Sequence, residues 1–210
     1  RLKEQGVKVI EDCAQSFLNS VNRSSKADMR IFSFYPTKII NAGDGGAILT
    51  DNKELADKCS QYVYYDDSES LTAEGYNFKF SNLHAALGLG SLEGIDTYTE
   101  SLKLQYSRYK KTVSGFDFVR VLDNSESEFL YKFNLVFTMN TIRDKFITEM
   151  KTQGVQCSSE LMHLTDDKGD YPNTSELVNN SVSIPYFPDL SVDELNQVCK
   201  SISIVLKSIR

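Results

Sequence analysis

The sequence lacks the features of a membrane, secreted or nucleic-acid-binding protein. No stretch of its 210 residues approaches the roughly 18 to 20 consecutive apolar residues of a membrane span, and the first residues lack the apolar core of a signal peptide. Basic side chains are too few for nucleic-acid binding, because 23 lysines and arginines stand against 29 acidic residues, a formal charge of −6. We therefore predict a cytoplasmic protein that binds neither a membrane nor a nucleic acid.

Cysteine and histidine are also scarce, and their placement indicates neither a disulfide framework nor a zinc site. The four cysteines contain no C-x-x-C pair, and only two histidines could supplement them as ligands. We predict no metal site. What is present, 40% apolar and 25% charged residues, is the balance of an ordinary globular chain with one large domain or two small ones.

Short apolar runs in the first 62 residues predict strands that alternate with helical segments. The second run is closed by Pro36, and Gly43-Asp44-Gly45-Gly46 predicts a tight turn before the third. Asp51 with Glu54 resembles a capping box that opens a helix from residue 52 to about 62. Such alternation predicts a mostly parallel α/β sheet, whose ligands gather at the carboxyl ends of the strands. The predicted strands are 7–10, 29–35 and 47–50.

Apolar spacing predicts a long helix in the middle of the chain, from a cap at Ser81-Asn82 to about Val113. Strand-like runs follow at 116–121 and 129–139. Two further helices are expected, one opened by a cap at Thr141 with Asp144 and a final one opened by Ser191 with Glu194. This part of the chain is typical of a second, α+β unit joined to the first by the long helix.

Polar residues and glycines follow the early strands in an uncommon order, although each is ordinary by itself. Asp12 could be a turn residue, Lys38 a solvated lysine, and the glycine turn a place that needs positive φ. Together with their neighbours they resemble the DegT/DnrJ/EryC1/StrS sugar aminotransferases, enzymes of fold type I that use pyridoxal 5′-phosphate (PLP). The matching segments are Val9 to Ser16, Phe32 to Lys38, Gly43 to Ala47, Gly75 to Asn77 and Ala85 to Gly88.

The resemblance implies a role for five side chains. Lys38 matches the catalytic lysine that holds the cofactor as a Schiff base and moves the proton between substrate and cofactor. Asp12 matches a buried carboxylate that keeps the cofactor's ring nitrogen protonated, and Gln15 matches an amide that contacts the ring oxygen. Ser33 matches a hydroxyl that contacts the phosphate. Asn77 matches an asparagine that reaches the cofactor phosphate of the partner subunit in a homodimer.

The resemblance also implies the activity and the partial extent of the chain. The resemblance predicts the transfer of an amino group from glutamate to a nucleotide-linked keto-sugar. Lys38 favours this reaction over a dehydration, which relatives with histidine in its place catalyse. The strand before Asp12 begins almost at Arg1, and no initiator methionine is present, so we expect the C-terminal portion of a longer enzyme. Residues 1–90 would form part of the large cofactor-binding domain, 91–114 a connecting long helix, and 115–210 the small α+β domain.

Two other interpretations remain open from the sequence. The chain could be a truncated remnant without a complete pocket, catalytically incompetent and serving at most as a partner-binding subunit. It could also be another fold-type I enzyme such as a lyase, although the segment from Phe32 to Lys38 together with Gly75-Tyr76-Asn77 favours the sugar group.

Overall fold

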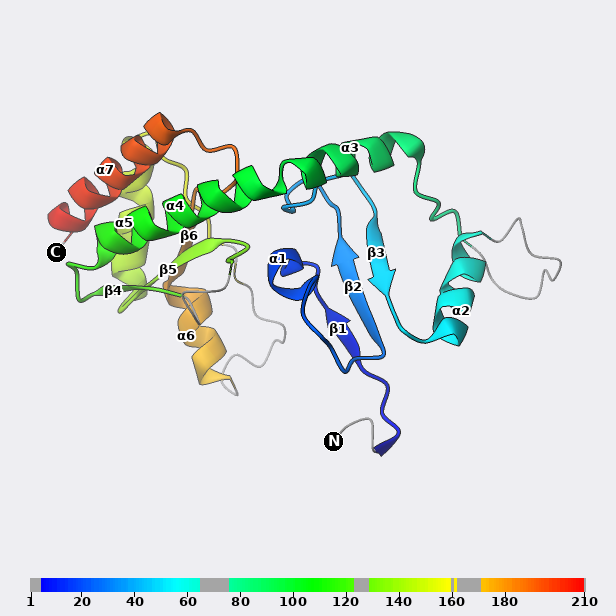
Figure 1. Ribbon diagram of the computed structural model, residues 1–210. Coiled ribbons are helices and arrows are strands. Elements are labelled where there is room, and N and C mark those ends of the chain that lie inside the picture. Colours follow the sequence, from blue (N-terminus) through cyan, green and yellow to red (C-terminus); the bar gives the residue numbers. More distant parts are fainter. Residues whose placement is uncertain (1–4, 65–75, 123–128, 160, 162–170, 210) are drawn as a thin grey trace. The chain divides into compact units, whose positions relative to one another are not determined.

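The protein divides into two compact units in the computed structural model (Figure 1), which describes residues 5–64, 76–122, 129–159, 161 and 171–209. The N-terminal unit comprises Arg1–Asp96 and the C-terminal unit Thr97–Arg210. Both units combine helices with a three-stranded sheet, which confirms the α/β class. Within the described ranges, no helix is long and apolar enough to cross a membrane.

The N-terminal unit is built on a mixed sheet with the strand order β1-β2-β3. β1 pairs with β2 in parallel, whereas β2 pairs with β3 in the antiparallel direction, with Ile31 opposite Ile48. The sequence predicts a mostly parallel sheet. The antiparallel step arises because residues 34–45 return directly as a loop, without the crossover helix that a parallel connection requires. The elements of this unit are β1 (Ile10–Asp12), α1 (Phe17–Ser20), β2 (Met29–Ser33), β3 (Gly46–Leu49), α2 (Lys53–Val63) and α3 (Asn82–Glu93).

Several boundaries differ from the predicted ones. The first strand begins at Ile10 rather than at Val7, because the Val9 N–H donates to the Asp28 carboxylate at 2.8 Å and leaves the ladder. The N-cap of α2 is Asn52 rather than Asp51, since the Asn52 side chain accepts from the Leu55 N–H.

Gly94 divides the predicted long helix into two. The Ser81 cap is confirmed, because the Ser81 hydroxyl accepts from the His84 N–H. α3 ends at Glu93, and Gly94 closes it by donating its N–H toward the Gly90 and Leu92 carbonyls. α4 (Ile95–Val113) then begins at the boundary between the units and carries the chain into the C-terminal unit.

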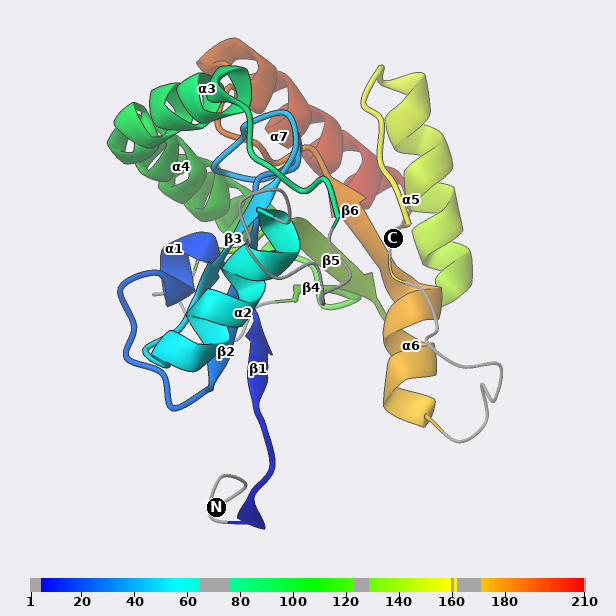
Figure 2. The same cartoon turned by 90° about the vertical axis from the view of Figure 1, so that its right-hand side faces the viewer.

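The C-terminal unit contains an antiparallel sheet of order β4-β5-β6 with helices packed against it (Figure 2). The predicted strands at 116–121 and 129–139 are shorter in the structure, and the helix expected at Thr141 has Met139 as its N-cap, without a side-chain bond. The capping box of Ser191 and Glu194 is confirmed. The elements after α4 are β4 (Val119–Val121), β5 (Phe133–Phe137), α5 (Asn140–Thr152), α6 (Pro172–Asn180), β6 (Ser181–Ile184) and α7 (Val192–Ser208).

The hydrophobic core lies in the C-terminal unit. Side chains from α4, β5, β6, α5 and α7 form one contiguous buried cluster there. At its centre the Phe133 ring is fully buried, and its centroid lies 5.2 Å from that of Tyr109 and 5.8 Å from those of Tyr106 and Tyr186. In the described part of the N-terminal unit, by contrast, the fully buried apolar residues are Cys13, Phe32, Ile40 and Ala42. The two units therefore differ sharply in how much apolar surface they bury by themselves.

Gly46 is required by the close approach of β2 to β3. A Cβ at this position would lie 2.3 Å from the Phe32 carbonyl oxygen, a backbone atom that cannot move without disturbing the β2–β3 ladder. We expect Gly46→Ala to lower the free energy of unfolding by about 1–3 kcal/mol, measured by urea denaturation. Gly90→Ala is the matched control, because its Cβ would meet nothing within 4 Å and alanine favours the helix by up to about 1 kcal/mol. Equal effects of the two substitutions would contradict this explanation.

Candidate functional site

Asp12 and Ser33 lie at the ends of two neighbouring strands. Asp12 is the last residue of β1 and Ser33 the last residue of β2. Because these strands are parallel, with Asp12 opposite Ile31, both carboxyl ends meet at one edge of the sheet. This is the edge at which parallel α/β sheets place their ligands, so the topology brings a carboxylate and a hydroxyl to the expected place.

Asp12 is exposed among the described residues, whereas the sequence predicts a buried carboxylate. Its Oδ1 accepts the Ala14 N–H at 3.0 Å, which turns the chain out of β1. Gln15 follows three residues after Asp12, just before α1, and its side chain is also exposed.

Lys38 lies on the loop that follows β2 and is half-buried. The Lys38 N–H donates to the Tyr35 carbonyl at 2.8 Å, and the Tyr35 N–H donates to the Ser33 hydroxyl at 3.3 Å. Two backbone bonds close the base of this loop, from Phe34 N–H to Gly45 O at 2.9 Å and from Ala42 N–H to Phe34 O at 3.0 Å. The lysine is therefore presented by a short loop that is fixed at both ends next to the end of β2.

The glycine turn makes this closed loop possible. Gly43 and Gly45 adopt φ values of 81° and 94°, which are costly for other residues. The Asn41 side chain accepts the Gly43 N–H at 2.8 Å, and the Asn41 carbonyl accepts the Ser91 hydroxyl of α3 at 2.8 Å. The turn predicted from Gly43-Asp44-Gly45-Gly46 is confirmed by these angles.

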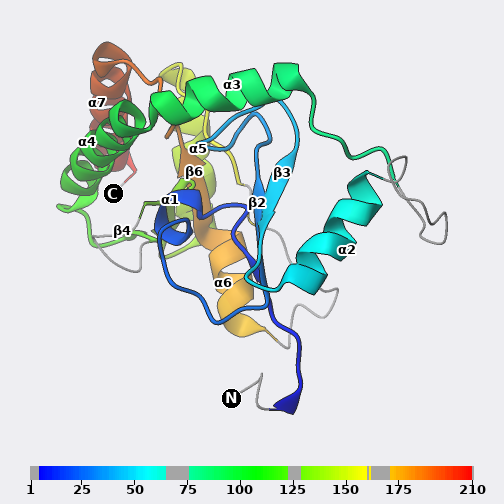
Figure 3. The same ribbon diagram turned by 45° about the vertical axis from the view of Figure 1, so that its right-hand side comes forward.

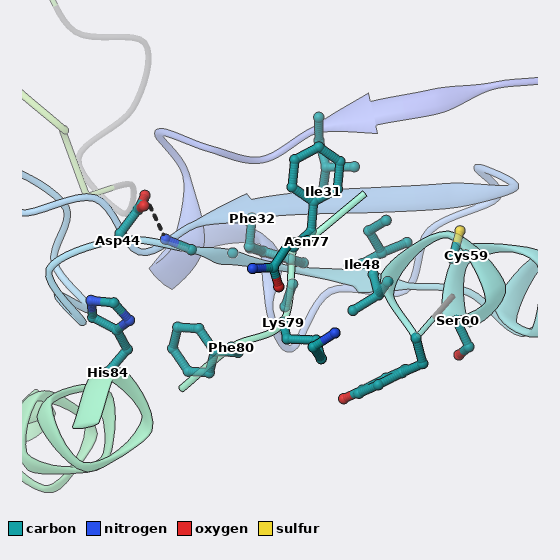
Figure 4. A pocket seen from close by; sticks show the side chains of 16 residues that line it. Ile31, Phe32, Asp44, Ile48, Cys59, Ser60, Asn77, Lys79, Phe80 and His84 are labelled. Carbon is teal, nitrogen blue, oxygen red and sulfur yellow. Dashed lines mark hydrogen bonds between the residues drawn. The ribbon is translucent and has the colours of Figure 1, made fainter. Parts of the chain in front are cut away.

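α2 lies beside β3 on the side away from β2 (Figures 1 and 3), and a cavity of about 740 Å³ is lined by residues of β2, β3 and α2. Its far wall is α2, and the segment 77–80 closes it after the Tyr76 N–H bonds to the Tyr62 carbonyl at 3.0 Å. The side chains that line it include Ile31, Phe32, Ile48, Cys59, Asn77, Lys79, Phe80 and His84 (Figure 4).

Of the five predicted site residues, Asn77 lines this cavity, and the other four do not. Asp12, Gln15, Ser33 and Lys38 belong to the carboxyl edge of β1 and β2 and the turns that follow it. Asn77 is exposed, and Gly75 of the same motif lies outside the described residues. Of the predicted residues, the structure thus places Asn77 alone in the lining of this cavity, which Asp44 and Gly45 at the end of the Lys38 loop share.

His84 is a cavity residue to which the sequence reasoning assigned no role beyond that of a possible metal ligand. Its Nδ1 lies 3.0 Å from the Ser81 hydroxyl, and its ring stacks on Phe80 with centroids 5.9 Å apart. Phe80 in turn covers Gly45, where a Cβ would meet the ring at 2.5 Å. In the sequence, the spacing of His84, three residues after the helix cap Ser81, could have indicated its contact with the Ser81 hydroxyl. Across the described ranges, no group of three His, Cys, Asp or Glu residues could hold a metal ion.

Comparison with protein families and curated proteins points to a single group. The model of the DegT/DnrJ/EryC1/StrS aminotransferase family matches residues 2–203. A GDP-perosamine synthase of Escherichia coli O157:H7 is 28% identical over 96% of this chain and 59% of its own length. A dTDP-3-amino-3,4,6-trideoxy-alpha-D-glucose transaminase of Micromonospora megalomicea subsp. nigra is 25% identical over 96% of this chain and 59% of its own length. The chain therefore spans about three fifths of the length of these relatives.

Solved structures agree on the fold. DesV from S. venezuelae, solved in complex with a ketimine intermediate, matches with a TM-score of 0.85 at 20% identity, over 98% of this chain and 60% of its own. The ntda protein from Bacillus subtilis, solved with bound cofactor PMP, matches with a TM-score of 0.80 at 24% identity, over 98% of this chain and 52% of its own.

Proposed function

Because this chain belongs to the DegT/DnrJ/EryC1/StrS aminotransferase family, we propose that it is part of a PLP-dependent enzyme that transfers an amino group from glutamate to a nucleotide-linked keto-sugar. The observation that carries the proposal is the meeting of Asp12 and Ser33 at one sheet edge, with Lys38 on the closed loop that follows. The names of the relatives, a GDP-perosamine synthase and a dTDP-sugar transaminase, support the nucleotide-sugar class of substrate.

The donor set at this edge fits PLP chemically. An aldehyde needs an amine, a ring nitrogen needs a carboxylate, and a phosphate needs hydroxyl and amide donors. Lys38, Asp12 and Ser33 supply these three groups from a loop and two adjacent strand ends. The exposure of Asp12 and Gln15 leaves room at this end of the sheet for a bound ring.

Each side chain has one task in this proposal. When bound, PLP withdraws electrons from the substrate carbon that loses its proton. The Lys38 amine would hold the cofactor through its aldehyde group and, when free, would move the proton as a general base and acid. The Asp12 carboxylate would accept a hydrogen bond from the ring nitrogen, and the Gln15 amide and the Ser33 hydroxyl would donate to the ring oxygen and the phosphate.

The proposal extends to the assembly and domains of the whole enzyme. We place residues 1–90 in the cofactor-binding domain, 91–114 in the connection, and 115–210 in the small domain. In a cytoplasmic homodimer, Asn77 would donate to the cofactor phosphate bound by the partner subunit. The exposure of Asn77 supports this role, because a residue that serves another subunit must be accessible to it.

Selective labelling of Lys38 tests the proposed function. We expect incubation with PLP, followed by borohydride reduction and peptide mass analysis, to place one cofactor on Lys38. In the proposed site the Lys38 amine lies beside the groups that hold ring and phosphate, and this proximity would favour its reaction over that of other lysines. Lys53, whose side chain is 87% exposed, serves as the internal control peptide. Labelling spread over surface lysines, or none on Lys38, would instead support the catalytically incompetent remnant.

A further inference from the structure

The loop 34–45, which carries the lysine of the proposed function, packs against one face of α3 (Figures 1 and 3). Ala42 of this loop is fully buried, and a Cβ at Gly88 would lie 3.3 Å from its Cβ. A Cβ at Gly43 would lie 3.5 Å from the His84 ring. His84 and Gly88 are four residues apart, so a single face of α3 supports the returning half of the loop.

Phe80 covers the glycine at the end of this loop. A Cβ at Gly45 would lie 2.5 Å from Cε2 of the Phe80 ring, so the ring leaves no room for a side chain there. The Gly45 carbonyl accepts the Phe34 N–H, which is one of the two bonds that close the base of the loop. The Phe34 ring also lies 6.2 Å from that of Phe80, measured between centroids. Phe80 therefore lies against both residues of the bond that closes the loop.

The glycine turn gives this contact a mechanical role. Gly43, Gly45 and Gly46 follow each other within four positions, and glycine restricts the backbone less than any other residue. A turn of this composition samples many conformations unless its surroundings restrict it. The Phe80 ring, on which the His84 ring stacks with centroids 5.9 Å apart, supplies such a restriction from outside the loop (Figure 4).

The exposure of Phe80 separates this role from that of a core residue. Phe80 is 40% exposed, whereas Phe32 of the same unit is 5% exposed. A side chain that stays so exposed buries little apolar surface and contributes correspondingly less to the stability of the unit. The contacts of Phe80 are directed instead at the closure of the loop.

We propose that Phe80 is a positioning residue, which holds the loop 34–45 closed and thereby fixes the place of Lys38. A fixed amine reacts faster, because fewer orientations are lost when it meets its partner. The use that is made of Lys38 rests on the proposed function, whereas the closure of the loop is a property of the chain that can be measured without cofactor.

Amide hydrogen exchange tests the closure of the loop. In cofactor-free Phe80→Ala, we expect the amides of Phe34 and Ala42, whose bonds close the loop, to exchange at least about tenfold faster. The Cys13 amide, which bonds to the Ile31 carbonyl across β1 and β2, should change by less than about twofold. Unchanged exchange in the loop, or equal acceleration of all three amides, would overturn the proposal, because Phe80 would then hold nothing in place or only stabilise the unit as a whole.

Labelling of Lys38 measures the consequence for the amine. With PLP and borohydride, Phe80→Ala should lower the labelling rate of Lys38 about tenfold and leave that of the exposed Lys53 unchanged. Phe80→Leu, which keeps an apolar side chain beside Gly45, should restore exchange and labelling to within about threefold of wild type. If Lys38 of the wild-type chain takes up no PLP, the proposed function fails, whereas the exchange rates still decide whether Phe80 closes the loop.

Phe78→Ala provides the matched control. Phe78 lies two residues before Phe80, is 69% exposed, and stacks on Tyr76 with ring centroids 5.3 Å apart. Its truncation should leave loop exchange and Lys38 labelling within about twofold of wild type. Circular dichroism and urea denaturation verify that both alanine variants fold. An effect of Phe78→Ala equal to that of Phe80→Ala would contradict the proposal, because the contact with Gly45 would then not be the cause.

Discussion

Lys38→Ala is expected to reduce amino transfer by at least about a thousandfold, because in the proposed function one amine both anchors the cofactor and moves the proton. The PLP-loaded protein would be mixed with glutamate, and the absorbance change of the bound cofactor would report the rate. The effect should appear in the rate of amino transfer rather than in cofactor binding alone, since in the proposed site Asp12, Gln15 and Ser33 remain to hold ring and phosphate.

The control for this substitution is another lysine of the same unit. Lys53→Ala removes an exposed lysine whose ion pair with Asp57, at 2.7 Å, lies on the surface of α2. Exposed ion pairs of this kind contribute little to the stability of a protein, so the rate of amino transfer should stay at the wild-type level. A Lys38→Ala protein that retains a rate within a few fold of wild type would exclude Lys38 as the catalytic amine.

Phe133→Ala is expected to lower the free energy of unfolding of the C-terminal unit by about 3–5 kcal/mol. Phe133 is completely buried, and three tyrosine rings lie within 5.8 Å of its centroid, so its removal leaves a cavity that they cannot all fill. Urea denaturation followed by tyrosine fluorescence measures the change.

Phe187→Ala provides the comparison for this prediction. The Phe187 side chain is 46% exposed, while its backbone N–H and carbonyl bond to Gln105 and are unaffected by truncation of the ring. We expect this substitution to lower the free energy of unfolding by less than about 1 kcal/mol. If both phenylalanine variants were equally stable, Phe133 would not be the centre of the core.

The N-termini of the helices show which boundaries the local sequence can predict. The caps at Ser81 and Ser191 were predicted correctly because a hydroxyl and an N–H three residues later form a contact within one turn. The cap at Thr141 was wrong. There the Thr138 N–H bonds to the Phe118 carbonyl of a distant segment, and the helix begins at Asn140 soon after the ladder ends. A boundary set by a long-range backbone bond is invisible to local patterns.

The candidate site divides in the same way. Asp12, Ser33 and Lys38 could be named from the sequence, because the segments that contain them resemble those of the family. Their meeting at one sheet edge depends on the parallel pairing of β1 with β2, which joins residues about twenty positions apart. The cavity that His84 lines depends on four separate segments of the chain, so no local pattern could predict it.

The sequence by itself determined the α/β class, the family and the residues that carry the proposed chemistry, because these depend on side-chain identity and on spacing along the chain. Only the tertiary structure decided that β3 runs antiparallel, that Asp12 is exposed, and that the N-terminal unit leaves Ile48 and the leucines of α3 uncovered. Burial and strand pairing join residues that are distant in the chain, and their outcome depends on what surrounds them rather than on any one segment.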